Sequence, residues 1–206
     1  MERTHNMKTT MVTVRGLTTL AGAAAVMLSV LSSVAFGDGD ASKIRWDIMQ
    51  HPNLVISPGG VASALAADKS MITLTGSGTF EPGGEVTGGG TWATFDSSGK
   101  QTASGKYRIV NLVTWHTAPG TLPCPPVTDT IGNCADATAG LAVFRIQYSN
   151  GGLGKLVISC HLPVGSSPST YEGLTVSKGF VDYYLPVPPD PTGNGTLFHV
   201  VGRDDD

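Results

Sequence analysis

The chain has 206 residues, of which 40% are hydrophobic and only 14% charged, and its formal net charge at pH 7 is −3. This length is sufficient for one domain with a substantial core. A mildly acidic chain without a cluster of lysines and arginines argues against nucleic acid as a partner and against electrostatic binding to anionic membranes.

The first 35 residues have the composition of a secretory signal peptide. A basic start precedes the uncharged, apolar segment 16–35, which ends in Ser33-Val34-Ala35, a small-x-small cleavage pattern. We expect a signal-peptide helix that is cleaved after Ala35 or, as a second choice, after Gly37. The apolar run is nearly long enough to span a bilayer, so an uncleaved anchor is the alternative. Cleavage would make the protein secreted or periplasmic by bacterial-type export, without membrane insertion afterwards.

Three further segments follow the expected signal peptide. Residues 36–52 are predicted to be a linker and lead-in, with one helical turn around residues 44–49. Residues 53–202 are predicted to form a single β domain. Residues 203–206 form an acidic tail, which we expect to be solvated.

The predicted β domain shows strand patterns almost throughout. Residues 70–80, for example, alternate apolar and polar side chains with the period of two that marks a half-buried strand. Turn sequences rich in Gly, Pro, Asp, Asn and Ser separate the strands. The expected strands are 61–67, 70–80, 85–95, 104–116, 139–148, 153–162, 171–184 and 196–201. The fold class is therefore all-β, an antiparallel barrel or sandwich of about seven to nine strands.

Two glycine-rich strands favour the barrel. Residues 75–80 read TGSGTF and residues 87–92 read TGGGTW. Glycine inside a strand permits a sharp bend or a close approach of another backbone, and tight barrels need such bends. In composition this pair resembles strands of allene-oxide-cyclase and dirigent-type barrels. The resemblance covers only these two strands and implies an alternative fold, an allene-oxide-cyclase/dirigent-like barrel.

The three cysteines fit an oxidising compartment. Cys124 and Cys134 bracket a loop that contains Pro and Gly, and they are the natural disulfide pair, although the sequence leaves the other pairings open. Cys160 and His161 are adjacent, which suggests a reactive pair. On a strand, however, neighbouring side chains point to opposite faces, so we interpret Cys160 as an inert core thiol whose pKa is raised by burial.

A candidate ligand pocket is predicted around the strand 171–184. Lys178 and Asp182 fall on the same face as large apolar residues, and enclosed ionisable groups are typical of binding and acid–base sites. The alternative is that a bulge at Gly179 exchanges the faces and leaves the charges in water. His116, at the end of a strand beside the cysteine loop, and His199 complete the predicted ligand-binding set.

The sequence contains no local spacing of metal ligands and no GxSxG motif. Glu172 and Asp182, at roughly 33 Å along one strand, are too far apart to act as the carboxylate pair of a glycosidase. We therefore predict no catalytic residues, metal ligands or cofactor. The first hypothesis is an exported, non-catalytic binding or cell-envelope interaction module, whose partner is an unknown small molecule or an envelope component. The alternative is a small-molecule isomerase or cyclase with an enclosed pocket lined by Lys178 and Asp182. A metal-dependent oxidoreductase is the third hypothesis.

Overall fold

Six strands close an antiparallel β-barrel in the computed structural model of the chain, which describes residues 42–189 and 194–202. The expected signal peptide, residues 36–41 of the expected linker and the acidic tail 203–206 lie outside the described residues. In order around the barrel, the strands are β9 (Ala137–Tyr148), β14 (Asn194–Val201), β1 (Lys43–Gln50), β5 (Ser77–Phe80), β6 (Gly89–Phe95) and β7 (Gln101–Ala118). The ring closes because β7 pairs with both β6 and β9.

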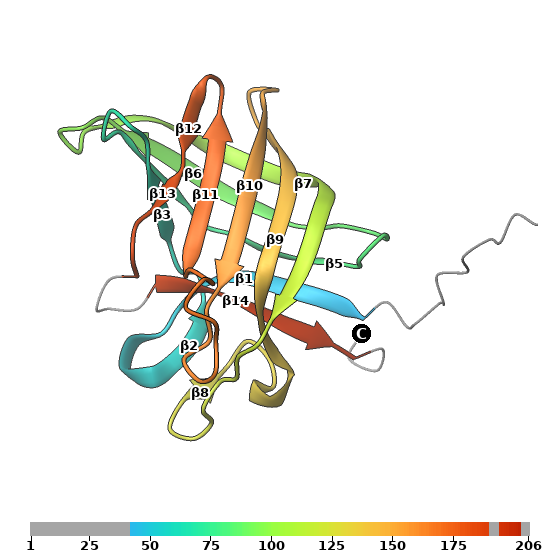
Figure 1. Cartoon of the computed structure of the whole chain (residues 1–206). Coiled ribbons are helices and arrows are strands. Elements are labelled where there is room, and N and C mark those ends of the chain that lie inside the picture. Colours follow the sequence, from blue (N-terminus) through green and yellow to red (C-terminus); the bar gives the residue numbers. More distant parts are fainter. Residues whose placement is uncertain (1–41, 190–193, 203–206) are drawn as a thin grey trace, which may run out of the picture. The chain divides into compact units, whose positions relative to one another are not determined.

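Further strands extend the sheet beyond the ring on two sides (Figure 1). β10 (Leu153–Cys160), β11 (Gly173–Lys178) and β12 (Val181–Tyr183) continue from β9, whereas β4 (Met71–Leu74), β3 (Ala62–Leu65) and β13 (Leu185–Pro186) continue from β6. β2 (Val55–Pro58) pairs with β1 and, in parallel, with β8 (Thr128–Asp129). Two short 3-10 turns, η1 (Pro52–Leu54) and η2 (Cys134–Asp136), complete the elements.

The prediction of an all-β antiparallel fold is confirmed, and the structure selects the barrel over the sandwich. The described residues contain fourteen strand segments, against eight predicted strands. The predicted strands 70–80 and 171–184 are each divided in two, and β1, β2, β8 and β13 were not predicted. In this part of the chain no helix has the length and apolar character needed to cross a membrane.

The lead-in expected before residue 53 is instead a central strand. Residues 43–50, around which one helical turn was predicted, form β1 and pair with β14, β2 and β5. The prediction was wrong because Arg45 and Asp47 gave the segment a polar appearance. The two charges satisfy each other through a bidentate ion pair, with Nε–Oδ2 and Nη2–Oδ1 distances of 2.8 and 3.0 Å, while Trp46 and Ile48 enter the core.

The glycines of the two TG-rich strands allow the barrel to bend. The chain changes partners at Gly76, since β4 pairs with β3 whereas β5 pairs with β1. A Cβ atom at Gly78 would overlap the carbonyl oxygen of Thr87, and one at Gly90 would overlap that of Thr75. These glycines are therefore required by close backbone approach, as the sequence predicted.

An aromatic cluster fills the barrel. Phe80 contacts the rings of Trp115, Phe144 and Phe198 edge-on, with centroids 5.3 to 6.3 Å apart. Offset and edge-to-face contacts of this kind add to the stabilisation from burial alone. Trp115 lies on the same face as the buried Tyr107 and Ile109, because β7 shifts register against β9 twice before it and the second shift restores the face that the first one exchanged.

Candidate functional site

The structure separates Lys178 from Asp182. Across the β11–β12 hairpin, Lys178 pairs with Val181 and Ser177 pairs with Asp182. Directly opposed residues of an antiparallel pair share a face, so the two charged side chains lie on opposite faces. The prediction that they line one pocket fails because the chain reverses at Gly179, whose φ is 61°, and simple alternation does not continue through the turn.

Lys178 packs against aromatic rings. Its Nζ lies 4.2 Å from the ring centroid of Trp92 and 5.3 Å from that of Tyr148. This geometry is a cation–π contact, which anchors the end of β11 over the neighbouring strands. Asp182 is exposed on the outer side of the hairpin.

His116 lies on the exposed outer face of β7, where its Nε2 is 3.2 Å from the hydroxyl of Thr114. Its neighbour Trp115 points into the barrel instead. The structure therefore does not bring His116 together with Lys178 or Asp182 at an enclosed site.

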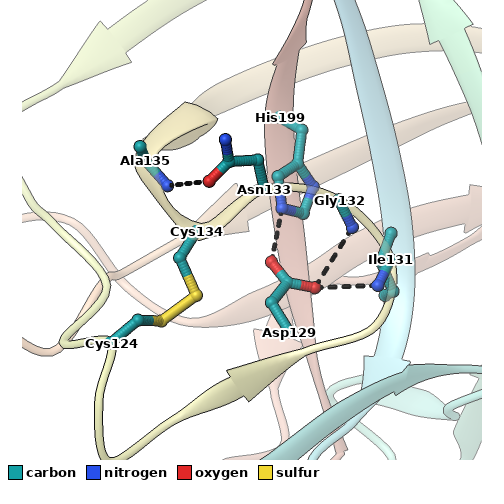
Figure 2. The surroundings of a disulfide bond; sticks show 8 residues. All are labelled: Cys124, Asp129, Ile131, Gly132, Asn133, Cys134, Ala135 and His199. Carbon is teal, nitrogen blue, oxygen red and sulfur yellow. Dashed lines mark hydrogen bonds and ion pairs between the residues drawn. A yellow bond between two sulfur atoms is a disulfide. The ribbon is translucent and has the colours of Figure 1, made fainter. Parts of the chain in front are cut away.

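His199 is buried and paired with a residue of the cysteine loop. Its Nε2–H donates to Asp129 Oδ2 over 2.7 Å, and the side chains of both residues are almost fully withdrawn from solvent. Asp129 Oδ1 also accepts hydrogen bonds from the backbone N–H groups of Ile131 and Gly132 (Figure 2). Gly132 packs so closely on the imidazole that a Cβ atom would lie 2.8 Å from the ring.

The predicted disulfide between Cys124 and Cys134 is confirmed, and Cys160 is a free, buried cysteine. Burial raises the pKa of the Cys160 thiol well above its ordinary value, which agrees with an inert core role.

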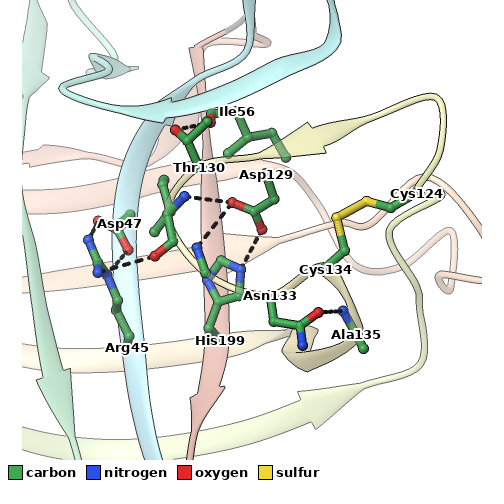
Figure 3. A network of polar contacts seen from close by, with 12 residues as sticks. Arg45, Asp47, Ile56, Cys124, Asp129, Thr130, Asn133, Cys134, Ala135 and His199 are labelled. Carbon is green, nitrogen blue, oxygen red and sulfur yellow. Dashed lines mark hydrogen bonds and ion pairs between the residues drawn. A yellow bond between two sulfur atoms is a disulfide. The ribbon is translucent and has the colours of Figure 1, made fainter. Parts of the chain in front are cut away.

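Polar contacts attach the cysteine loop to the barrel (Figure 3). Besides the Asp129–His199 pair, two hydrogen bonds to backbone carbonyl oxygens hold the loop. Arg45 Nη1 donates to the carbonyl oxygen of Ile131, and the hydroxyl of Thr130 donates to the carbonyl oxygen of Ile56. These bonds connect the loop to β1, β2 and β14. The contact of His199 with Asp129 is one of them, so His199 helps to hold the loop in place.

The largely apolar pocket that the loop helps to form was not predicted. Its volume is about 300 Å³. The walls come from β1, the segment leading into β2, the cysteine loop, the end of β10 and β14; the lining residues are Met49, His51, Leu54, Ile56, Leu122, Val127, His161, Leu162, Pro163, Glu172, Thr196 and Leu197. An apolar cavity of this size with a few convergent polar groups is typical of a small-molecule site.

Glu172 is the acidic group of this pocket. Its Oε2 accepts a 2.6 Å hydrogen bond from the backbone N–H of His161, and its Oε1 accepts one from the backbone N–H of Thr196. Burial nevertheless raises the pKa of the carboxyl from 4.5 to about 7, because the loss of water outweighs these hydrogen bonds. Glu172 therefore exchanges its proton near neutral pH.

Hydrogen-bond counting supports a protonated Glu172. The hydroxyl of Thr196 lies 2.6 Å from the carbonyl oxygen of Ser159, which can only accept, and 2.9 Å from Glu172 Oε1. A hydroxyl has one hydrogen, so it cannot donate fully to both oxygens. A proton on Glu172 satisfies both contacts, because Glu172 then donates to Thr196 and Thr196 donates to Ser159.

His161 contributes a second polar group with a defined tautomer. Its Nδ1 lies 2.8 Å from the carbonyl oxygen of Thr170, so Nδ1 carries the hydrogen and donates it. In the neutral ring, Nε2 then has a free lone pair and can accept a hydrogen bond. Cys160 and His161 do not form a reactive pair, because Cys160 is enclosed in the core whereas His161 lines the pocket.

The sequence held a partial signal for this site. Glu172 follows the same alternation as Leu174 and Val176, which are buried on the inner face of β11. Nothing local indicated the partners of Glu172, because they come from β14 and the end of β10.

Within residues 42–189 and 194–202, no group of three or more His, Cys, Asp or Glu side chains is arranged to hold a metal ion. No family model, no curated protein and no solved structure matches the chain.

Proposed function

We propose that this protein is an exported β-barrel binding domain that holds a small, mostly apolar molecule in the pocket beside Glu172. The single observation that supports this proposal most strongly is the pocket itself, where apolar walls enclose a carboxyl group and an imidazole. Binding of a small molecule is one of the two partner classes expected from the sequence, and the cavity favours it over an envelope component.

Export is supported by the signal-peptide composition of residues 1–35 and by the disulfide between Cys124 and Cys134. Amino-terminal sequencing of the protein recovered from a secreting bacterial host tests it. We expect the mature chain to begin at Phe36 or Asp38. Recovery of an intact N-terminus in the membrane fraction would contradict export by cleavage and favour the anchor.

Ligand binding is tested by thermal unfolding with three probes that share one alkyl chain: n-hexylamine, n-hexanol and n-hexanoate. A ligand at ten times its Kd stabilises the folded state by about 1.4 kcal/mol, which raises the Tm by roughly 3 to 6 °C for a domain of this size. We expect at least one probe to give such a shift.

A pocket-filling variant locates the binding. Val127 is a half-buried wall residue, so Val127→Trp should remove the shift. Val113→Trp is the matched control, because Val113 is 57% exposed on β7 and outside the pocket. A shift that survives Val127→Trp, or no shift with any probe, would overturn the proposed binding function.

A catalytic role is the second candidate, and the pKa of Glu172 near 7 is the observation that favours it, because a general acid or base works best near its operating pH. Its residues would be Glu172 and His161, not the separated pair Lys178 and Asp182. Mass spectrometry of the recovered probes distinguishes the two functions. Unchanged probes support the binding domain, whereas a product that Glu172→Gln fails to form supports the enzyme.

A further inference from the structure

We infer that the pocket selects molecules in which a short apolar body ends in a hydrogen-bond-donating cation, that is, small primary amines in their ammonium form. This inference rests on the proposed binding function and adds the chemical class of the ligand. It depends on the side chains that line the cavity and on the hydrogen bonds that those side chains already make.

The polar groups of the pocket have spare acceptors and few spare donors. The Nδ1–H of His161 is used by the Thr170 carbonyl, and the N–H and O–H of Thr196 are used by Glu172 and Ser159. The open positions beside Glu172 are the second lone pair of its Oε2 and Nε2 of the neutral His161 ring. The imidazole of His51, which also lines the pocket, adds one donor and one acceptor nitrogen in its neutral form. A ligand that donates hydrogen bonds fits these positions, and an ammonium group supplies three donors.

The charges that surround the pocket favour a cation over an anion. Among the described residues, no lysine or arginine lines it; the titratable groups that act on Glu172 are His161 and the Cys160 thiol, and His51 lines the same pocket. A ligand carboxylate would face the carboxyl group of Glu172 and would meet a like charge whenever that group ionises. An ammonium group would instead gain a charge-assisted hydrogen bond from the ionised form.

Thr196 can stabilise the negative charge that Glu172 acquires when an ammonium ion binds. When an ammonium ion enters, Glu172 releases its proton to solvent and becomes the carboxylate that pairs with the ligand. The hydroxyl of Thr196, which is 2.6 Å from the Ser159 carbonyl and 2.9 Å from Glu172, can then turn its hydrogen from Ser159 to Glu172. Below pH 7 binding therefore releases up to one proton, and the new charge is stabilised without movement of the strands.

The apolar body of the ligand has a defined place. Val127 from the cysteine loop and Leu122, which precedes Cys124, form walls together with Ile56 and Leu197 that bury an alkyl or aromatic group. The volume of about 300 Å³ accommodates a single short chain or one ring rather than a polymer or a peptide.

The test is calorimetric titration of the purified protein with n-hexylamine, n-hexanol and n-hexanoate at pH 6 and pH 8. For n-hexylamine we expect the affinity to rise about tenfold between these pH values, because a carboxyl with a pKa of about 7 goes from about one-tenth to about nine-tenths ionised. The affinity for n-hexanol should be weaker and nearly independent of pH. Tighter binding of n-hexanoate than of n-hexylamine at pH 8 would overturn the assignment of the ligand class.

Two variants identify the titrating group. Glu172→Gln should remove both the preference for the amine and its pH dependence, while the affinity for n-hexanol is retained as evidence of an intact pocket. If Glu172→Gln does not fold, His51→Gln and His161→Gln decide the point. The tenfold pH effect should persist in both, because neither change removes the carboxyl group, and its loss in either would overturn the inference. Failure of the proposed function has a different signature, in which none of the three probes binds.

Discussion

The Oε1 atom of Glu172 lies 2.9 Å from the hydroxyl oxygen of Thr196, and that hydroxyl lies 2.6 Å from the carbonyl oxygen of Ser159. Glu172 immediately precedes β11, Thr196 belongs to β14 and Ser159 to β10, so this short chain of hydrogen bonds joins three parts of the sheet. It positions a carboxyl group of shifted pKa at an apolar pocket. The pocket's chemistry and part of the protein's pH dependence follow from this arrangement.

Glu172 should make the stability of the protein depend on pH. Because the pKa of its carboxyl is about 7 in the folded protein and ordinarily 4.5, the folded chain holds a proton that the unfolded chain releases. Its contribution to the free energy of unfolding is therefore fully present below about pH 4.5 and is lost as the pH rises through 7. The loss amounts to roughly 3 kcal/mol at most, since one pKa unit corresponds to about 1.4 kcal/mol.

Urea unfolding of the wild type and Glu172→Gln at a series of pH values measures this effect. The glutamine has a similar shape and does not titrate, so the wild type should lose stability relative to the variant between pH 4.5 and 7.5. A constant difference between the two proteins over that range would show that Glu172 titrates in the folded state as it does in the unfolded chain.

The Asp129–His199 pair should be a main anchor of the cysteine loop. Asp129→Ala removes the acceptor for His199 and for the two backbone N–H groups of Ile131 and Gly132. The His199 side chain is buried, whereas the N–H of Ile131 is partly buried and that of Gly132 is exposed, so water can replace Asp129 at Gly132. A buried donor left without an acceptor costs about 1 to 3 kcal/mol, so we expect a loss of about 2 kcal/mol in urea unfolding. Asp182→Ala, the same change at an exposed carboxylate, should cost less than about 0.5 kcal/mol. Equal effects of the two variants would contradict the anchoring role.

The disulfide should support ligand binding through the pocket wall. Cys124 and Cys134 enclose Val127, which lines the pocket, and their sequence separation of 10 predicts a stabilisation of roughly 2 to 3 kcal/mol. We expect the double variant Cys124→Ser/Cys134→Ser to lose that stability in urea unfolding and to bind n-hexanol more weakly in calorimetry.

Treatment with a reductant provides the control. It should weaken binding by the wild type and leave the double variant unchanged. If reductant weakens binding by the double variant as well, the effect does not arise from this disulfide.

The class of fold could be predicted because it depends on local patterns. Alternation along the strands and turn sequences such as Asp96–Gly99 and Ser149–Gly152 placed most of β6, β7, β9 and β10 within a few residues of their observed ends. β1, which was predicted to be a lead-in with one helical turn, contains a charged pair that neutralises itself, Arg45 with Asp47. A sequence pattern shows such charges but not their mutual satisfaction.

The candidate site could not be predicted because it depends on distant residues. Alternation along the strand puts Glu172 on the face of Leu174 and Val176, but its hydrogen-bond partners are 11 and 24 positions away. The prediction also assumed that alternation continues through the turn at Gly179, and it therefore assigned Asp182 to the wrong face. His199 was singled out as a ligand-binding residue, although its partner Asp129 is 70 positions away and engages it in a structural contact.

Close backbone approach at the glycine-rich strands gives a direct test of the barrel. Gly90→Ala should destabilise the protein by about 3 kcal/mol or more, because its Cβ atom would overlap the carbonyl oxygen of Thr75. Gly152→Ala is the control, since the nearest atom to its Cβ is the side-chain Asn150 Oδ1 at 3.3 Å, and we expect a change below about 1 kcal/mol. Thermal or urea unfolding measures both, and a well-tolerated Gly90→Ala would contradict the strand packing described here.

The most direct test of the binding pocket is a two-dimensional NMR titration of the isotope-labelled protein with n-hexylamine at pH 8. The account predicts that saturable amide shifts gather around the pocket, at Val127, His161, Glu172 and Thr196, with only small shifts near the exposed His116 or around Lys178 and Trp92. Saturable shifts gathered around Lys178 and Trp92, or no saturable shift at all, would contradict the claim that this cavity is the ligand site.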